Sequence, residues 1–250
     1  MDGRDFPSKT YSPADLHQPQ IAPTARALRR FAFRLGLKAT RFSVNGVLHW
    51  RFRVREHKLW EYARGLACVL PTPPAGPVRL RVLDFGGAGT LPVFYLAQHG
   101  CEVLCLDIDP ALTEWTNRVA RDRGWNLRAS THDLVSTPAP SAWGRFDAVV
   151  SFSVLEHIAP PQQPFVLKRL AELLRPGGIF ALTFDFGLEA PVEGAVRDPA
   201  HVERLVAATE LAYLDGAGFL DTGERFHLDK RHPHRRFTFA SVFLKKKLDP

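Results

Sequence analysis

LRVLDFGGAGTLPVFYLAQHG, residues 80–100, is the stretch that decides the fold of this chain. It begins with an apolar run, Leu80 to Phe85, passes through three glycines and continues as a helical pattern that ends at Gly100. This order predicts a strand, a tight turn and a helix. Glycines let the backbone approach a ligand closely, and the helix that follows presents unpaired N–H groups and the positive end of its dipole. The stretch therefore predicts a site for a nucleotide-like or carboxylate-bearing ligand.

A second apolar run, Val103 to Leu106, follows about twenty residues later and ends in Asp107. A carboxylate at the end of the second strand of such a fold can accept hydrogen bonds from both hydroxyls of a ribose. The two runs together predict a bound nucleoside. A glycine cluster taken alone is often only a turn, so the prediction of a bound nucleoside depends on the carboxylate of Asp107.

VLDFGGAGT followed by LCLDIDP resembles the first two motifs of class I S-adenosylmethionine-dependent methyltransferases. In that family an acidic residue two positions before the first glycine organises the methionine end of the cofactor, and Asp84 is the matching position. The resemblance implies S-adenosyl-L-methionine as the cofactor and places these residues in its site: Asp84, Gly86, Gly87, Gly89, Asp107 and Ile108. The family pattern, acid-x-Gly-x-Gly-x-Gly, falls here on Asp84, Gly86, Ala88 and Thr90, so the turn is expected to differ slightly in shape.

The resemblance extends to two later motifs. Asp133 in the loop HDL, with Leu134, matches the position that hydrogen-bonds the adenine amino group, although aspartate in a loop is as often a turn former. The stretch FDAVVSFSVLEHI, residues 146–158, is read as a buried parallel strand, a loop and a short helix, with Ser151 and Phe152 facing the cofactor methyl group. The sequence lacks the Asn-Pro-Pro-aromatic tetrapeptide that is typical of enzymes that methylate exocyclic amines. This argues against a DNA base as the methyl acceptor.

The remaining pattern continues as alternating helices and strands. Asp109, Pro110 and Gly124 mark the two ends of a helix, and RPGG ends another before the strand IFALTFDF. After a further helix, FLDTGERFHLD and RRFTFASVFLKKK alternate like paired strands. The expected fold is a doubly wound α/β domain with a seven-stranded, mostly parallel, Rossmann-like sheet whose last strand is antiparallel, preceded by an N-terminal helical extension.

Three domains of the sequence differ in composition. Residues 1–24 lack sustained periodicity and are expected to be a flexible tail, residues 25–77 an N-terminal extension or lid with its linker, and residues 78–250 the S-adenosylmethionine-binding methyltransferase domain. Trp60 and Tyr62 are candidate substrate contacts because helices before the first strand often cover the cofactor in the resembling family. An amphipathic helix that buries its aromatic side chains is the alternative.

Composition indicates a soluble globular protein without a membrane-spanning or secretory segment, and hence a cytoplasmic one. Its three cysteines include no C-x-x-C pair, so neither a disulfide framework nor a zinc site is indicated. The net charge of +7 is uneven, because residues 1–81 hold 15 Lys and Arg against 5 Asp and Glu. A basic extension suits nucleic acid, anionic lipid or an acidic substrate, and is equally often only a solvated face.

Several functions are compatible with these observations. The leading one is methyl transfer to a small molecule, with His157 and Asp185 as candidate bases for a hydroxyl acceptor. Arg235 and Arg236, in DKRHPHRR between the last two strands, are candidate contacts for an anionic group on that acceptor. The alternatives are a nucleic-acid or protein methyltransferase that uses the basic extension, a non-catalytic nucleotide-binding module of the same fold, and a nicotinamide-dependent oxidoreductase.

Overall fold

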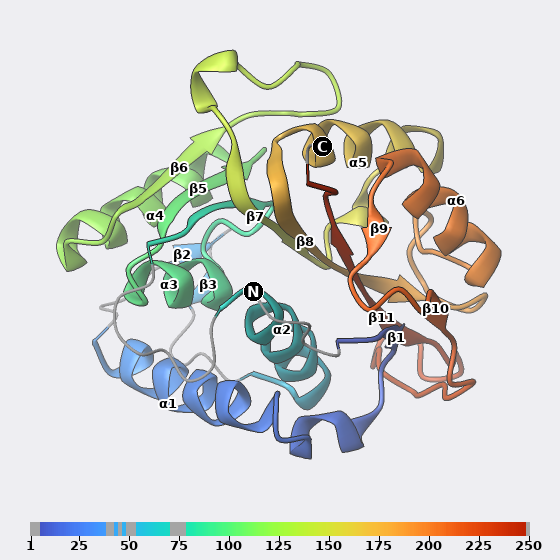
Figure 1. Cartoon of the computed structure of the whole chain (residues 1–250). Coiled ribbons are helices and arrows are strands. Elements are labelled where there is room, and N and C mark those ends of the chain that lie inside the picture. The colour runs from blue at the N-terminus through green and yellow to red at the C-terminus, as the bar shows by residue number, and fades with distance from the viewer. Residues whose placement is uncertain (1–5, 39–42, 45–46, 49–53, 71–78, 249–250) are drawn as a thin grey trace.

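The computed structural model describes residues 6–38, 43–44, 47–48, 54–70 and 79–248 (Figure 1). Five strands form the parallel core of its main sheet: β4 (Arg81–Phe85), β5 (Glu102–Asp107), β6 (Leu127–Thr131), β7 (Phe146–Phe152) and β8 (Leu174–Phe186). β11 (Thr238–Lys245) pairs antiparallel with β8. Three short strands, β1 (Ser8–Thr10), β9 (Ala212–Tyr213) and β10 (Phe219–Leu220), complete the sheet. The strand order is β10-β1-β11-β8-β7-β4-β5-β6, with β9 beside β11, which confirms the predicted doubly wound sheet with an antiparallel last strand.

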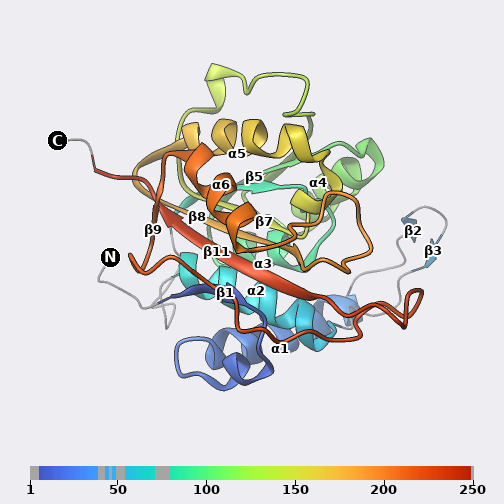
Figure 2. The same cartoon turned by 90° about the vertical axis from the view of Figure 1, so that its right-hand side faces the viewer.

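Helices cover both faces of this sheet because its central strands are apolar on both sides. Successive residues of a strand point to opposite faces of the sheet. Val82 and Val150 therefore belong to one buried cluster, and Leu83 and Val149 to the other. Figure 2 shows α5 and α6 on one side of the sheet and α1 and α2 on the other. The helices are α1 (Ala22–Lys38), α2 (Glu56–Val69), α3 (Leu91–Gln98), α4 (Pro110–Arg123), α5 (Gln163–Glu172) and α6 (Pro199–Thr209). A separate hairpin joins β2 (Ser43–Val44) to β3 (Val47–Leu48).

The predicted signals at the ends of α4 are present. The Asp109 carboxylate accepts hydrogen bonds from the backbone N–H groups of Ala111 and Leu112, at 2.8 and 3.2 Å. Gly124 ends the helix in the left-handed region, with φ of 63°, which a residue without Cβ adopts at little cost. Local sequence therefore sets the two ends of this helix.

The N-terminal segment differs from the expected flexible tail. Ser8–Thr10 form strand β1, which pairs antiparallel with β11 and parallel with β10 (Phe219–Leu220). Phe6, Tyr11 and Ile21 are buried around it, and Pro13–His17 form the 3₁₀ helix η1. Residues 1–5 lie outside the described residues. The segment has no periodicity because its few apolar residues are anchored singly, by contacts with distant parts of the chain.

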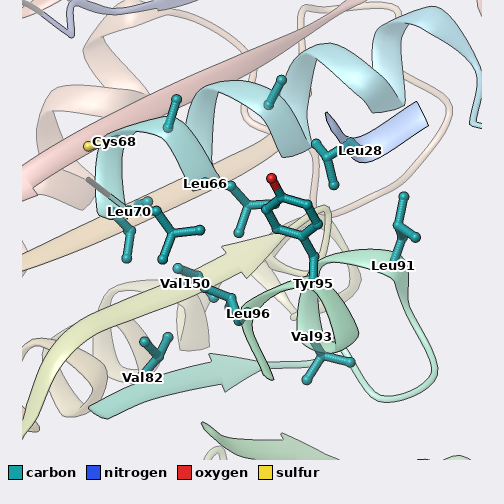
Figure 3. Packing of buried hydrophobic residues seen from close by; sticks show 14 of the residues in the cluster. Leu28, Leu66, Cys68, Leu70, Val82, Leu91, Val93, Tyr95, Leu96 and Val150 are labelled. Atoms are coloured by element: carbon teal, nitrogen blue, oxygen red, sulfur yellow. The ribbon is translucent and has the colours of Figure 1, made fainter. Parts of the chain in front are cut away.

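The extension before β4 is part of the core. α2 contacts β7, β8 and β11 directly, and α1 packs on the outside of α2 and α3. In Figure 3, Leu66 and Leu70 of α2 point toward Val150 of β7 and Leu96 of α3. The linker, residues 71–78, lies outside the described residues. The helical extension is therefore present, and α2 is a layer of the fold as well as a cover for one end of the sheet.

A buried ion pair joins α2 to η1. The Arg64 guanidinium lies 3.4 Å from the Asp15 carboxylate, and both side chains are almost fully buried. Trp60 Nε1 donates to the same carboxylate at 2.8 Å, and Lys9 Nζ lies 3.0 Å from it. Arg64 also donates to the carbonyl oxygen of Pro7. These bonds offset the cost of burying both charges and hold the N-terminal segment to the helix.

The end of the chain differs from the expected hairpin, in which FLDTGERFHLD pairs with the last strand. β10 has only two residues and pairs with β1, while Phe226, which follows it, forms an isolated bridge with Phe237, the residue before β11. β1 occupies the position beside β11 that the sequence assigns to a sixth parallel strand, and the sheet has nine strands where seven were expected. The turn at residues 229–236 does lie at the carboxyl end of β8, because Thr238 pairs with Phe186.

No helix among the described residues has the length and hydropathy needed to cross a lipid bilayer.

Asp15→Ala is expected to lower the free energy of unfolding by about 3–5 kcal/mol, because it leaves the Arg64 charge buried without its carboxylate. Urea denaturation followed by circular dichroism measures this change. Asp122→Ala on the exposed surface of α4 is the control and is expected to stay within about 0.5 kcal/mol of the parent. An equal, small loss in the two variants would contradict a structural role for the buried pair.

Candidate cofactor and acceptor site

The glycine turn between β4 and α3 has no room for larger side chains. Gly86 and Gly89 have φ angles of 78° and 76°, which residues with Cβ rarely adopt. A Cβ atom at Gly87 would lie 2.0 Å from Oδ1 of Asp84. The turn therefore folds tightly over the Asp84 carboxyl group and leaves its outer side to backbone atoms.

Asp84 is buried beneath this turn, where it is 1% exposed. Burial raises the pKa of its carboxyl group to about 7, although the Cys105 thiol, 3.4 Å away, donates a hydrogen bond to it. The predicted position of this acid at the end of β4, beneath the glycines, is thus present in the structure. Its carboxyl group can bind a ligand only through the turn, by orienting backbone groups.

Asp107 joins the end of β5 to the glycine turn. Its two carboxylate oxygens accept hydrogen bonds from Ala88 N at 3.2 Å and Asp109 N at 3.0 Å. Ile108, the next residue, is 73% exposed, so an apolar side chain stands free beside the carboxylate. A carboxylate with an apolar surface next to it suits the ribose and the base of a nucleoside. The residues present fit the predicted cofactor at this edge of the sheet.

The other predicted cofactor residues lie at neighbouring strand ends. Asp133 follows β6 and accepts hydrogen bonds from Val135 N and Ser136 Oγ, so it shapes its own turn, while Leu134 is buried. Ser151 Oγ donates to the carbonyl oxygen of Phe85 at 3.2 Å, which ties the end of β7 to β4.

Phe152, the last residue of β7, packs edge-on against Tyr62 with ring centroids 5.8 Å apart. α2 comes close here, because a Cβ atom at Gly65 would lie 2.2 Å from the Phe152 ring. Tyr62 also lines a groove of about 390 Å³ together with His57 and Lys58 of α2 and with Gly89, Thr90 and Leu91. The N-terminal turn of α2 thus stands beside the glycine turn.

A polar network lies between α2 and the ends of β7 and β8. The buried Glu61 carboxylate accepts hydrogen bonds from Ser153 Oγ at 2.5 Å and Thr183 Oγ1 at 2.6 Å. Lys58 Nζ lies 3.0 Å from Glu61 and donates to Ser153 Oγ at 2.5 Å. Burial lowers the pKa of Lys58, but Glu61, Tyr62 and Glu156 together outweigh it and hold that pKa above its ordinary value. Ser153 adopts φ of 55°, a rare angle for serine that the network holds in place.

Two buried carboxyl groups adjoin this network. Asp185 on β8 and Glu156 in η3 (Leu155–His157) are 9% and 3% exposed, and the charge of each acts on the other. Burial raises the pKa of each carboxyl group, and the nearby Asp185 charge raises that of Glu156 further. Glu156 Oε2 is buried and has no hydrogen-bond partner among the described residues. Asp185 is therefore well placed at the end of its strand, with a second acid beside it.

Some predicted site residues are placed elsewhere. Trp60 is fully buried and bonded to Asp15, so the prediction that it contacts substrate is wrong: it lies on a different side of α2 from Tyr62. His157 is exposed, and burial of part of its ring followed by the Lys58 charge lowers its pKa. Arg235 lines a different groove, of about 630 Å³, with Arg197 and residues 188–193. Arg236 donates its guanidinium to Arg225 O and its backbone N–H to Glu189.

The network of Lys58, Glu61, Ser153, Thr183 and Glu156 was not predicted. One sequence signal was available, because Glu61 is an acid within LWEYARGLACVL, a stretch otherwise dominated by apolar and aromatic residues. A buried carboxylate needs several donors, so such a position marks a place where other segments must supply them. Which segments supply them depends on the fold.

Comparison with known proteins matches residues 82–178 to a family of methyltransferase domains. The tRNA 5-carboxymethoxyuridine methyltransferase of Escherichia coli K12 is 30% identical over 117 residues, which cover 44% of this chain and 41% of that protein. The ubiquinone biosynthesis O-methyltransferase of Xanthomonas axonopodis pv. citri is 29% identical over 139 residues, 56% of this chain and 57% of that protein. The chain thus spans about half the length of these curated relatives.

Solved structures share the fold. The N-methyltransferase NodS of Bradyrhizobium japonicum, in complex with S-adenosylhomocysteine, has a TM-score of 0.56 at 16% identity and covers 89% of this chain and 98% of its own. The [4+2]-cyclase SpnF has a TM-score of 0.58 at 15% identity, covering 92% and 93%. Together with the domain match, these findings confirm the predicted resemblance to class I S-adenosylmethionine-dependent methyltransferases. Because one neighbour is a cyclase, the fold by itself does not define the reaction.

Asp84→Asn is expected to flatten part of the pH dependence of stability. The folded pKa of Asp84 is raised from 3.8 to about 7, so the stability present below pH 4 is lost as the pH rises through 7. Asparagine cannot ionise, and the variant should gain on the order of 3 kcal/mol relative to the parent between pH 4.5 and 8. Urea denaturation across this range measures the difference, with Asp122→Asn as control. Parallel curves for parent and Asp84→Asn would contradict the assignment.

Proposed function

We propose that this protein, whose residues 82–178 form a class I methyltransferase domain, transfers a methyl group from S-adenosyl-L-methionine to a small-molecule acceptor. The observation that carries the proposal is the hydrogen bond from Ala88 N to the Asp107 carboxylate. It brings together the glycine turn and the acid at the end of β5, the two parts of the chain on which a nucleoside-binding site of this fold depends. The domain match covers both parts.

The cofactor, S-adenosyl-L-methionine, supplies a methyl group carried on a positively charged sulfur. Asp107 would bind its ribose hydroxyls, and Ile108 would cover one side of its adenine, with Asp133 and Leu134 at the other end of the ring. Gly86, Gly87 and Gly89, supported by Asp84, would pass beside its amino-acid end. Ser151 and Phe152 stand at the end of β7, where the resembling family positions the methyl group.

Methyl transfer needs an aligned acceptor and little else, because the donor is already activated. A hydroxyl acceptor additionally needs a base. Asp185, near the end of β8, and His157, in η3 beyond β7, are the candidates, since the Lys58 charge acts on both. Tyr62 would contact the acceptor or the cofactor, because it lines the groove beside Gly89 and Thr90. Arg235 and Arg236 remain proposals for an anionic acceptor, although the groove that Arg235 shares with Arg197 and His234 is also lined by Glu189 and Glu193.

One observation favours a second candidate, a nucleic-acid methyltransferase. The outer face of α1 carries four exposed arginines, Arg26, Arg29, Arg30 and Arg34, and in their midst Phe33 is 69% exposed. Three of these arginines and Phe33 line a shallow groove of about 560 Å³. Arginine interspersed with an aromatic ring suits phosphates and an unstacked base. We infer that if the acceptor is RNA, this face docks it.

Asp107→Ala is expected to weaken binding of S-adenosylhomocysteine by roughly ten- to more than a hundredfold. The loss of charge-assisted hydrogen bonds to the ribose costs on the order of 1.5–3 kcal/mol. Isothermal titration calorimetry measures it, with Asp122→Ala as the matched control. A folded Asp107→Ala protein with parental affinity would sink the assignment of the ribose site. A parent protein that does not bind S-adenosylhomocysteine would sink the proposed function.

Arg30→Ala/Arg34→Ala tests the nucleic-acid alternative. If α1 docks RNA, the logarithm of affinity for unfractionated transfer RNA should fall linearly with the logarithm of salt concentration. The double variant should reduce that slope by about 0.7 for each phosphate that the protein no longer neutralises. Fluorescence anisotropy between 50 and 200 mM salt follows the change, and Arg118→Ala/Arg121→Ala on the surface of α4 is the control. Equal slopes for the two double variants would contradict docking of RNA on α1. The small-molecule function would then be the one remaining candidate.

A further inference from the structure

The groove between α2 and the glycine turn has cationic side chains on its wall and no acid. Arg55, His57 and Lys58, at the start of α2, line it together with Gly89 and Thr90, and its volume is about 390 Å³. None of the described residues that line it is an aspartate or a glutamate. A cleft lined by one sign of charge attracts the opposite charge. The groove therefore suits an anionic group.

The positive charge of the groove comes from two side chains that are held in different ways. Lys58 Nζ lies 3.0 Å from the Glu61 carboxylate and donates to Ser153 Oγ at 2.5 Å, and 32% of the Lys58 side chain stays exposed. An ammonium group has three donors, so Lys58 keeps one for a ligand. Glu61 balances the charge of Lys58. Arg55 supplies the uncompensated charge, because its side chain is exposed and forms no ion pair or hydrogen bond with the rest of the described chain.

Two further features of the groove favour a carboxylate. Tyr62 lines it, and within the described ranges the Tyr62 hydroxyl has no hydrogen-bond partner, so its O–H is available to a ligand. The groove also reaches Leu91, the first residue of α3, whose N-cap side chain, Thr90, donates to Gly87 O at 2.7 Å and leaves the first turn of the helix uncapped. The positive end of the helix dipole favours a negative charge there.

The groove lies where the amino-acid end of the cofactor would come. Asp107, the proposed ribose ligand, accepts a hydrogen bond from Ala88 N, and Ala88 is followed directly by Gly89 and Thr90 of the groove. The proposed function assigns the adenine to Ile108, which is exposed beside Asp107. The opposite end of the ribose carries the sulfur and the amino-acid group. That group would therefore extend along the glycine turn into the groove.

We propose that Arg55 and Lys58 bind the carboxylate of the amino-acid end of S-adenosyl-L-methionine, so that α2 selects a methyl donor that retains this carboxylate. The inference rests on the proposed function and adds two residues of the N-terminal extension to the cofactor site. Neither residue takes part in the transfer of the methyl group. They hold the far end of the donor, and the Glu61 network holds Lys58 in place for that contact.

A donor without the carboxylate is disfavoured for two reasons. It loses charge-assisted hydrogen bonds to the two cations. Its remaining ammonium group also comes beside the Arg55 charge, which repels it. The groove therefore discriminates between S-adenosylmethionine and its decarboxylated form.

Three ligands test the inference by isothermal titration calorimetry. They are S-adenosylhomocysteine, its decarboxylated analogue, and 5′-methylthioadenosine, which has the same nucleoside and no amino-acid group. The parent should bind S-adenosylhomocysteine at least about tenfold more tightly than either of the other two. Arg55→Ala should weaken binding of S-adenosylhomocysteine by about three- to tenfold, and Lys58→Met by at least about tenfold. Both variants should bind 5′-methylthioadenosine within about twofold of the parent.

Controls separate a lost contact from a lost fold. Lys58→Met leaves Glu61 buried without its cation, so thermal unfolding is measured for each variant, and the exposed Arg55→Ala decides the test if Lys58→Met does not fold. Lys58→Arg keeps the charge and should keep a preference for S-adenosylhomocysteine. Arg118→Ala, on the surface of α4, should bind all three ligands as the parent does. Asp107→Ala should weaken all three alike, because each carries the ribose.

Failure of the inference is distinguishable from failure of the proposed function. The inference is overturned, while the nucleoside site stands, if the parent binds S-adenosylhomocysteine no more tightly than 5′-methylthioadenosine. The same follows if folded Arg55→Ala and Lys58→Met weaken the two ligands equally or leave both unchanged. If the parent binds none of the three ligands, the proposed function falls and takes the inference with it.

Discussion

The buried Glu61 carboxylate is the interaction on which the acceptor side of the site depends. It joins three segments, because Ser153 beyond β7 and Thr183 on β8 donate hydrogen bonds to it, and Lys58 on α2 forms an ion pair with it. A buried charge is tolerated only when its partners are in place, so the N-terminal turn of α2 has one position relative to the two strand ends. That position sets Lys58 and Tyr62 beside the glycine turn and leaves Glu156 and Asp185 enclosed next to them.

Helix α2 is also held in place on another side, through Arg64. Arg64 donates to Ser241 of β11 and to Pro7 O, and pairs with Asp15 of η1, while β1 fills the place beside β11. Residues that precede the first core strand therefore belong to the same folding unit as the last strand. A lid that opens freely is incompatible with so many buried bonds, so changes of the site during turnover must come from segments other than the body of α2.

The cofactor side could be predicted from the sequence because its signals are local. Val103–Leu106 is a continuous apolar run, Leu80–Phe85 is mostly apolar, and the glycines and the helix cap act within a few residues. β1 could not be predicted, because three residues have no period and their pairing partner, β11, lies more than two hundred residues away. The roles of Trp60 and Tyr62 could not be separated either. α2 is buried nearly all round, so its hydrophobic pattern does not tell which side faces the site.

The net charge of the chain is also misleading about the acceptor, because the basic residues and the carboxyl groups of the site lie in different places. The excess of Lys and Arg lies in residues 1–81, and on α1 the arginines point to solvent, whereas the strand ends are lined by Glu61, Glu156 and Asp185. Exposed arginines act at long range, and salt screens them; buried carboxyl groups act on one bound atom at short range, with little screening. A phosphate or carboxylate next to the reacting atom would be repelled by these carboxyl groups. The acidic interior therefore disfavours an anionic group at the strand ends, whatever anion the basic surface attracts.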